Sequence, residues 1–582
     1  MLLRWASLVT LAARASSGAV VQPPSSGGNA SDSLDAQLLG DTLDALQVMQ
    51  DAYFKPWIGT WPTAIDWTAA VMGSHIAGAL QSLSDGFEAA RAHGIDDFKA
   101  SENRISLYFS HLTAFYFGQD AFSLRNQAYD DMLWVVLGWL DSIKFAKAHS
   151  KAHYGKISRQ GQLSNRQNEA WYGNIWSPAF SHRARIFWHL AANGWDTVLC
   201  GGGMNWNPKL MPYKNAITNE LYIAASIAMY LHFPGDSNTS PFRARDDSAR
   251  GTPASWPPHD PKYIEAAVNG YNWLASSNMT NSVGLFADGF HISGYSSGSN
   301  NTKCDERDEM VYTYNQGVIL TGQRGLYEVT GDQRYLHAGH TLIHNVIKAT
   351  GWDMKRNTTI DDLSKLHHGF LPRWHGLGRA GILEDACDML GECSQDAQTF
   401  KGIWMHHFTA FCAPLEPQIE ERFLGHNREA YADINLQHVK ACRAYAGWLR
   451  HNANAARKTR DQYGRFGMWW TAGLLNRVTA SDIQIEPDAV PPSENVVDYR
   501  NVGVPNDSVW KTVEVPAPSP EDSQQRPLRP QKRGVIVADV NDRGRGRTVE
   551  TQSGGLALLR ALWEISRLPR PIKPARPLHV GL

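Results

Sequence analysis

Long apolar runs with helical spacing, separated by short Gly-Asp turns, constrain the fold of this chain more than any other feature. One apolar run ends near Thr330, where Gly331 fits the cap that follows a helix and Asp332 fits the residue that opens the next one. The stretch around Gly235 and Asp236 repeats this pattern. A helix, a tight turn and a second helix form an αα-hairpin, so the pattern predicts a chain built from paired helices.

The number of these hairpins suggests how they assemble. Six helices have polar, sometimes Gly-containing starts, near residues 66, 128, 215, 312, 399 and 551. Runs of alternating β-branched residues are few, which favours an all-α protein. Six hairpins close into an (α/α)6 barrel with the polar starts gathered at one mouth, and this is the fold we predict. A helical solenoid is the alternative that the same hairpins allow.

Both ends of the chain and one late insertion fall outside the helical repeat. Residues 1–19 combine a basic residue, an apolar stretch and small residues, which is typical of a signal peptide. Residues 20–35 are rich in Pro, Ser and Gly and are predicted to be disordered. The barrel is expected over residues 36–480 and is completed by 551–570. A Pro-rich charged insertion at 481–550 precedes the last helix, and a tail at 571–582 follows it.

Two further features agree with secretion. Six sites have the N-x-[ST] pattern of N-glycosylation, at Asn29, Asn238, Asn278, Asn300, Asn357 and Asn506. The six cysteines predict three disulfides, of which only the local pair Cys387–Cys393 can be chosen from spacing. The C-terminal residues are not an apolar tail, so we expect neither a GPI anchor nor a transmembrane helix. We therefore expect a secreted protein, either extracellular or in a cell wall.

The charge balance excludes several classes of ligand. Lys and Arg number 56 and Asp and Glu 57, so no strong field of either sign draws the chain to nucleic acid or to an anionic membrane. Phosphate-binding loops of the GxxxxGK[ST] type are absent. A neutral substrate fits this balance better than a phosphorylated one. The 21 tryptophans serve either a large core or a sugar-binding cleft.

Two adjacent carboxylates, Asp130 and Asp131, stand at the front of the apolar run "AYDDMLWVVLGWLDSI". One interpretation is a helix cap, because Asp favours helix N-termini. The other is catalysis: a retaining glycosidase places two carboxyl groups about 5–5.5 Å apart. Neighbouring residues of a helix point roughly 100° apart, so two carboxylates on its first turn can be this close. Their repulsion is expected to raise one pKa and leave the other low.

Four stretches in this order change the weight of these interpretations: "YDDMLWVVLGWL", "GWDTVLCGGGMNW", "YTYNQGVILTGQRGLYEVTGD" and "TFKGIWMHH". Together with "DWTAAVM" and "ADGF", they resemble glycoside hydrolase family 76, the α-1,6-mannanase family, over residues 60–475 and the last helix. The resemblance implies an (α/α)6 barrel and retaining cleavage of α-1,6-mannan or mannoprotein glycans, with endo action favoured. By position it implies that Asp130 is the nucleophile and Asp131 the acid/base.

The chain also departs from the family pattern. Tyr129 precedes the pair where many relatives have Asn, and Met132 and Leu133 follow it where bacterial relatives tend to be polar. We therefore expect the subsite beside the pair to differ. The insertion at 481–550 has no counterpart in the core pattern.

Other side chains are candidates for the wall of a sugar cleft, each with a structural alternative as a cap, a turn or a packed ring. They share aromatic faces or groups that bond sugar hydroxyls: Trp134, Trp195, Asp196, Trp206, Asn219, Asp288, Tyr314, Asn315, Gln316 and Lys401. Adjacent histidines such as His406 and His407 do not share a helix face. We expect no metal and no cofactor, because double displacement needs none, and we expect a monomer.

Three other functions use the same fold. A cell-wall transglycosylase needs the same carboxylate pair, with a sugar hydroxyl in place of water. A non-catalytic mannan-binding barrel tolerates loss of either aspartate, and both are present. A different six-hairpin enzyme, such as a sugar epimerase or a calcium-dependent mannosidase, needs histidines at the mouth or a calcium ion.

Overall fold

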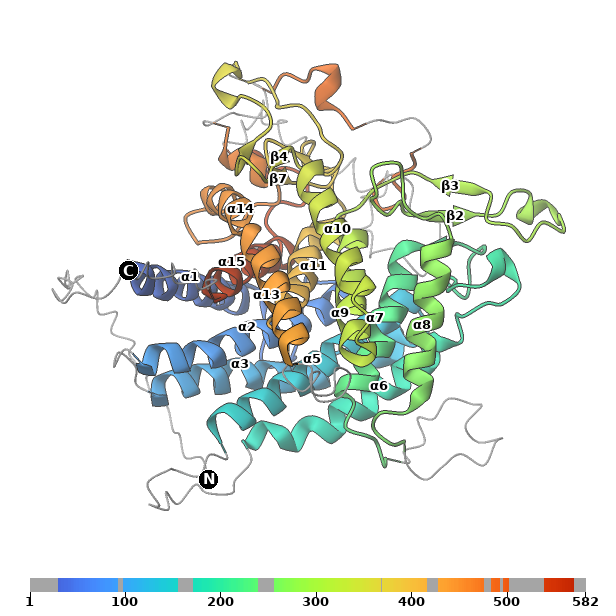
Figure 1. Cartoon of the computed structure of the whole chain (residues 1–582), viewed down its shortest axis with the longest axis horizontal. Helices are drawn as coiled ribbons and strands as arrows, with labels where there is room; N and C mark the ends of the chain where they lie inside the picture. The colour runs from blue at the N-terminus through green and yellow to red at the C-terminus, as the bar shows by residue number, and fades with distance from the viewer. Residues whose placement is uncertain are drawn as a thin grey trace, which may run out of the picture.

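The computed structural model describes residues 30–92, 98–154, 171–238, 256–367, 369–415, 428–475, 483–491, 496–501 and 539–569. Helices make up most of these ranges (Figure 1). The predicted signal peptide at 1–19, the predicted tail at 571–582 and most of the predicted insertion lie outside the described residues.

Six helices of the described chain form a closed inner ring. They are α2 (Asp66–Ala92), α5 (Tyr129–His153), α7 (Ala216–His232), α9 (Val318–Thr330), α11 (Gln395–Cys412) and α15 (Val549–Arg567). Each packs against the next in this order, and α15 packs back against α2. These helices begin near the six predicted polar starts. The predicted (α/α)6 barrel is confirmed, and because the ring closes, the fold is not an open solenoid.

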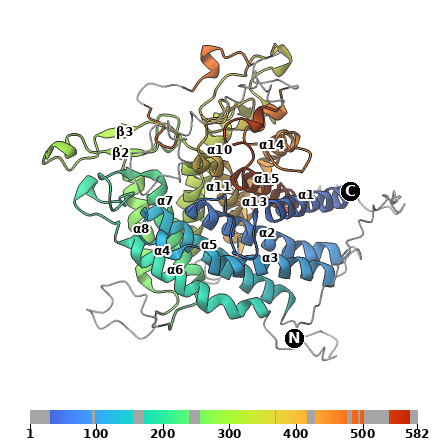
Figure 2. The same cartoon turned by 180° about the vertical axis from the view of Figure 1, so that it is seen from behind.

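An outer layer of helices covers this ring. α3 (Phe98–Gly118) packs on α2, α6 (Ser177–Ala192) on α5, α8 (Pro261–Ser276) on α7 and α10 (Arg334–Ala349) on α9. Figure 2 shows α2, α3, α5 and α6 as neighbouring rods on the rear side. α13 (Arg428–Ala444) contacts α11, and α14 (Ala446–Lys458) contacts α15. The short helix α4 (Ala121–Leu124) leads into α5.

The sixth hairpin joins the two ends of the chain. α1 (Ala30–Tyr53) packs on α15 and α2, so the partner of the last inner helix comes from the first described residues (Figure 1). The sixth hairpin therefore does not follow the order of the chain. One expectation was wrong here, because a helix begins inside the segment 20–35. Leu38, Leu46 and Met49 are buried, and helix formation is cooperative, so this packed stripe supports the turns before it.

The two Gly-Asp turns behave differently. Gly331 ends α9 with a φ of 71°, and the Asp332 carboxylate accepts a hydrogen bond from the Arg334 N–H at 2.9 Å, close to the predicted cap. Gly235 also has a positive φ of 95°. Asp236, however, opens no helix. Its carboxylate contacts Arg185 at 2.6 Å, because a buried arginine needs a buried counter-charge.

Short strands and turns occupy the connections. β1 (Lys214–Asn215), β2 (Gly289–His291) and β3 (Glu306–Asp308) form one antiparallel sheet in that order, with Gly289 opposite Asn215 and Asp308. Two-stranded pairs join β4 (Trp352–Asp353) to β5 (Thr358–Thr359) and β6 (Gly378–Arg379) to β7 (Ile382–Leu383). Because β1 directly precedes α7, the first sheet borders the mouth. The 3-10 turn η5 (Tyr314–Gln316) precedes α9 in the same way.

Three disulfides link the described chain: Cys200–Cys304, Cys387–Cys393 and Cys412–Cys442. The predicted local pair is confirmed. Trp404, Trp448 and Trp470 are among the largest fully buried side chains, so many tryptophans serve the core. Within the described ranges, every helix is too short or too polar to cross a membrane.

Candidate active site

The first turn of α5 holds both carboxylates of the aspartate pair. Its N-cap residue is Ala128, whose side chain cannot cap. The Asp131 carboxylate instead accepts a hydrogen bond from the Ala128 N–H at 3.2 Å, and the Asp130 carboxylate accepts one from the Asp131 N–H at 3.1 Å. Both side chains thus stabilise the helix start, although neither is the N-cap. Their exposed fractions are only 5% and 4%, so they lie inside the mouth.

Asp130 has polar partners from two distant segments. The indole Nε1 of Trp206 donates a hydrogen bond to Asp130 Oδ2 at 3.1 Å. An Arg500 guanidinium nitrogen lies 3.9 Å from the same oxygen. Arg500 also donates to the Tyr314 hydroxyl at 2.9 Å. The anionic form of Asp130 is therefore stabilised by a cation and an N–H donor.

The surroundings of the two carboxyl groups separate their pKa values. Burial raises the pKa of Asp130 to about 6, and Arg500 opposes this rise. Burial, the charge of Asp130 and the charge of Asp396 raise the pKa of Asp131 well above its ordinary value. We expected one low and one raised pKa. Burial instead raises both, and the charge of Asp130 adds to the rise at Asp131, whereas Arg500 opposes the rise at Asp130, so the surroundings favour the anion on Asp130 and the proton on Asp131.

A second polar group lies beside Tyr314. Asp288 precedes β2 and accepts hydrogen bonds from the Tyr213 hydroxyl at 2.6 Å and from the Asn315 amide at 3.2 Å. Among the described residues, no partner donates to the amide oxygen of Asn315, which is buried. The Tyr314 ring stacks on Phe400 with centroids 3.8 Å apart. These groups form a polar wall with a free buried acceptor.

Two predicted site residues brace the backbone. The Asn219 side chain exchanges hydrogen bonds with the N–H and carbonyl of Met204 at 2.7 and 3.2 Å. Gln316 exchanges hydrogen bonds with the N–H and carbonyl of Phe286 at 2.8 and 2.9 Å. Their amides are engaged within the protein, so they position the loops that carry Trp206 and Asp288.

The glycine loop at residues 201–203 has a similar bracing role. Asp196 accepts hydrogen bonds from the N–H groups of Val198 and Leu199 at 2.8 and 3.2 Å. The Trp195 ring stacks on Tyr222, with centroids 5.7 Å apart. A side chain at Gly203, where φ is +87°, would meet the Trp273 ring at 2.5 Å. Beyond this loop, Trp206 contacts the pair through its hydrogen bond to Asp130.

Trp134 and Lys401 have other partners. The Trp134 ring stacks on Trp67 at 5.8 Å, and Trp67 donates a hydrogen bond to Asp396 at 2.8 Å. Lys401 forms a buried ion pair with Asp388, which occupies its charge. Trp134 therefore packs against the ring that holds Asp396, whereas the charge of Lys401 is engaged by Asp388.

Sequence reasoning missed Arg500, Tyr213, Trp67 and Asp396. Arg500 lies inside the segment that we predicted as a Pro-rich excursion. The only local signal is "VVDYRN", a short mixed apolar and polar stretch between proline-rich flanks. Nothing in its spacing indicates a contact with residue 130.

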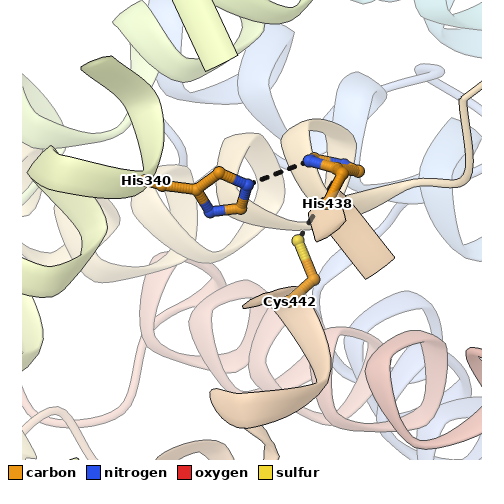
Figure 3. Close-up of side chains that lie close together, drawn as sticks. All are labelled: His340, His438 and Cys442. Atoms are coloured by element: carbon orange, nitrogen blue, oxygen red, sulfur yellow. Dashed lines mark hydrogen bonds between the residues drawn. The ribbon is translucent and has the colours of Figure 1, made fainter. Parts of the chain in front are cut away.

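Histidines also gather away from the mouth (Figure 3). His340 Nε2 and His438 Nδ1 lie 3.0 Å apart, and the Cys442 sulfur lies 3.9 Å from His438 Nε2. This trio has metal-like spacing. The Cys442 sulfur, however, is bonded to Cys412, so it offers no thiolate ligand. The His pair is a buried hydrogen-bonded contact between α10 and α13.

A closed ring of six helical hairpins with two adjacent, buried carboxyl groups at its mouth defines an (α/α)6-barrel protein with a candidate acid–base site. A family model described as "Glycosyl hydrolase family 76" matches residues 258–476, in agreement with the resemblance that the motifs carry. The matched region begins after Asp130 and Asp131.

Two curated relatives come from yeasts. The "Mannan endo-1,6-alpha-mannosidase DCW1" of Saccharomyces cerevisiae is 22% identical over 254 residues, 43% of each chain. The protein of the same name from Candida glabrata is 24% identical over 319 residues, 54% of this chain and 55% of the relative. The chain thus spans about half the length of these relatives. The solved GH76A alpha-1,6-mannanase of Salegentibacter sp. HEL1_6 aligns with a TM-score of 0.44 and 16% identity, covering 90% of this chain and 98% of that one.

Proposed function

We propose that the protein is a retaining glycoside hydrolase that cleaves α-1,6-mannosidic linkages, with endo action on mannan. The observation that carries the proposal is the buried pair Asp130 and Asp131, whose surroundings favour one anion and one acid. The names of the two yeast relatives, mannan endo-1,6-alpha-mannosidases, support the substrate class.

In the first step, an Asp130 oxygen attacks the anomeric carbon while the bond from that carbon to the leaving sugar's oxygen breaks. Asp131 gives its proton to this oxygen, and a glycosyl ester on Asp130 results. In the second step, the Asp131 carboxylate takes a proton from water and the water oxygen bonds to the anomeric carbon. The ester bond breaks, which restores the Asp130 carboxylate and protonated Asp131.

The remaining candidates fall into two groups, according to whether their polar groups are already engaged in hydrogen bonds or ion pairs within the protein. Trp206, Tyr314, Asp288 and Asn315 are assigned to sugar binding, because they lie beside the pair or leave a buried acceptor open. Trp134 supports this wall. Trp195, Asp196, Asn219, Gln316 and Lys401 are assigned to holding the loops. We extend the proposed substrate class to mannoprotein glycans. We also propose that the enzyme is secreted and acts as a monomer.

The test is sugar release from linear α-1,6-mannan by the full chain, beside Asp130→Ala and Asp131→Ala with circular dichroism as a folding check. Loss of the acid/base is expected to lower the rate about 10²–10⁴-fold. Added azide distinguishes the roles. It should give the glycosyl azide with retained configuration in Asp131→Ala and with inverted configuration in Asp130→Ala.

Each outcome has a meaning. If folded wild type releases no sugar and transfers none to an added mannose acceptor, the enzymatic proposal fails and a mannan-binding barrel replaces it. Transfer without release identifies a transglycosylase using the same pair. If the two azide products are exchanged between the variants, the assigned roles of Asp130 and Asp131 are wrong.

A further inference from the structure

A short segment from the predicted insertion crosses the mouth beside the pair. We call residues 496–501 the strap. Its Val497 N–H donates to Asp308 at 3.1 Å, and the Tyr312 hydroxyl donates to Asp498 at 2.7 Å. The Asn501 side-chain oxygen accepts a hydrogen bond from the Ser394 N–H at the start of α11. The strap is therefore tied to three separate parts of the barrel.

These ties direct one side chain into the site. The Arg500 side chain is 18% exposed, donates to the Tyr314 hydroxyl at 2.9 Å and approaches Asp130 Oδ2 to 3.9 Å. Its guanidinium lies 5.3 Å from the centre of the Trp206 ring. Arg500 thus touches both the aromatic residue that bonds Asp130 and the aspartate itself, although 370 residues separate it from Asp130 in the sequence.

We propose that Arg500 is a positioning residue of this site: held by the strap and by Tyr314, it keeps the Asp130 carboxylate anionic and oriented for attack. The inference rests on the proposed function for its catalytic meaning, whereas the charge of Asp130 can be measured without catalysis. It also gives the insertion a role, because a barrel without the strap lacks this cation.

The other charges at the mouth make a cation at this place necessary. Asp131 adjoins Asp130 on α5, Asp396 approaches from α11, Asp288 from the strand side and the Tyr314 phenol from η5. Arg500 is the cation that acts on both aspartates of the pair. Lys401 and Lys214 contact Asp388 and Asp196 instead. Four carboxyl groups and a phenol therefore share one guanidinium.

The experiment compares wild type with Arg500→Met, Arg500→Lys and the control Arg334→Met, an exposed arginine paired with Asp332. The pH profile of kcat/KM is measured on α-1,6-mannan. An opposite charge at this distance lowers a carboxyl pKa by about 1–3 units, so its removal should move the acidic limb up by that amount. Arg500→Lys should restore part of the shift, and Arg334→Met should follow wild type.

A second measurement is independent of substrate. Aspartate labelled with 13C at the carboxyl carbon is titrated by NMR in an Asp131→Asn background, with Asp130→Asn assigning the signal. The Asp130 pKa should rise by about 1–3 units in Arg500→Met. An unchanged titration and an unchanged acidic limb overturn the inference. If wild type cleaves no mannan but the titration shifts, the proposed function fails and the positioning role of Arg500 stands.

Circular dichroism checks that each variant folds. Should Arg500→Met not fold, Arg500→Gln removes the charge and keeps a polar, shorter side chain. A pH profile of Arg500→Gln that matches wild type counts against the inference as firmly as one of Arg500→Met.

Discussion

Asp130 and Asp131 are chemically identical neighbours, and their different surroundings separate their behaviour. Asp130 receives the Trp206 indole N–H and faces Arg500, whereas Asp131 bonds a backbone N–H and faces the charges of Asp130 and Asp396. Each donor to Asp130 favours its anion, and each nearby charge disfavours a second anion. The difference in pKa between the two carboxyl groups therefore depends on the loops that carry these partners.

Trp206→Phe tests this at one bond. The change keeps a ring beside Arg500 and removes the N–H donor, and a hydrogen bond to a charged group contributes about 1.5–3 kcal/mol. We expect kcat/KM to fall about 10-fold or more. Because burial sets the Asp130 pKa at about 6 and loss of the donor raises it further, the acidic limb should move to higher pH. Trp195→Phe, whose ring packs on Tyr222, is the matched control. Identical profiles for both variants would contradict this role.

Helices α10 and α13 meet at a buried histidine contact that depends on pH. His340 of α10 meets His438 of α13 at 3.0 Å and the Tyr445 hydroxyl at 2.8 Å. Burial, reinforced by nearby histidines, lowers the pKa of His340 to about 4, and burial lowers that of His438 well below its ordinary value. Both rings are neutral in the fold at neutral pH. The contact therefore stabilises the protein above the unfolded pKa of 6.5 and loses this stabilisation as pH falls.

His340→Gln should reduce this loss. Between pH 7.5 and 4.5 the unfolded chain binds a proton at His340 that the folded chain does not, worth roughly 2–3 kcal/mol. We expect the variant to be less stable than wild type at pH 7.5 and to lose less stability at pH 4.5, measured by urea unfolding. His367→Gln, at an exposed position outside these helices, should follow the wild-type slope. An unchanged slope in His340→Gln would show that this ring is already protonated in the fold.

The elements differ in how far the sequence predicts them. Apolar spacing and polar starts act within one helix, so the inner helices were predicted close to their observed starts at Asp66, Tyr129 and Ala216. The strap was not predicted, because its contacts with Asp308, Tyr312 and Ser394 depend on segments far away in the sequence. Its Pro-rich flanks also resemble an unstructured segment. The prediction that Asp236 opens a helix was wrong for the same reason. A carboxylate after glycine fits a helix cap, and its partner Arg185 is known only from the fold.

Over the whole molecule, the ring is completed by helices from opposite ends of the described chain. α1 covers α15, and α15 contacts both α11 and α2. At the start of α15, Glu550 accepts hydrogen bonds from Thr68 and Gln395, each at 2.9 Å, which ties three inner helices together near the mouth. The packing of α1 therefore supports the geometry of the site through α15, although α1 contributes none of the proposed catalytic groups.

Leu46→Ala tests this dependence on closure. Leu46 of α1 is fully buried, and truncation of a buried leucine to alanine costs about 2–5 kcal/mol. We expect a lower midpoint of chemical unfolding, with mannan cleavage and helical circular dichroism lost together, because opening α1 exposes α15 and breaks the ring. Gln47→Ala, at the next and exposed position, should leave the midpoint within about 0.5 kcal/mol of wild type. In the contrary outcome, Leu46→Ala loses a small part of its helical signal at low denaturant, while cleavage persists to the wild-type midpoint. α1 then unfolds independently, and closure of the ring does not require it.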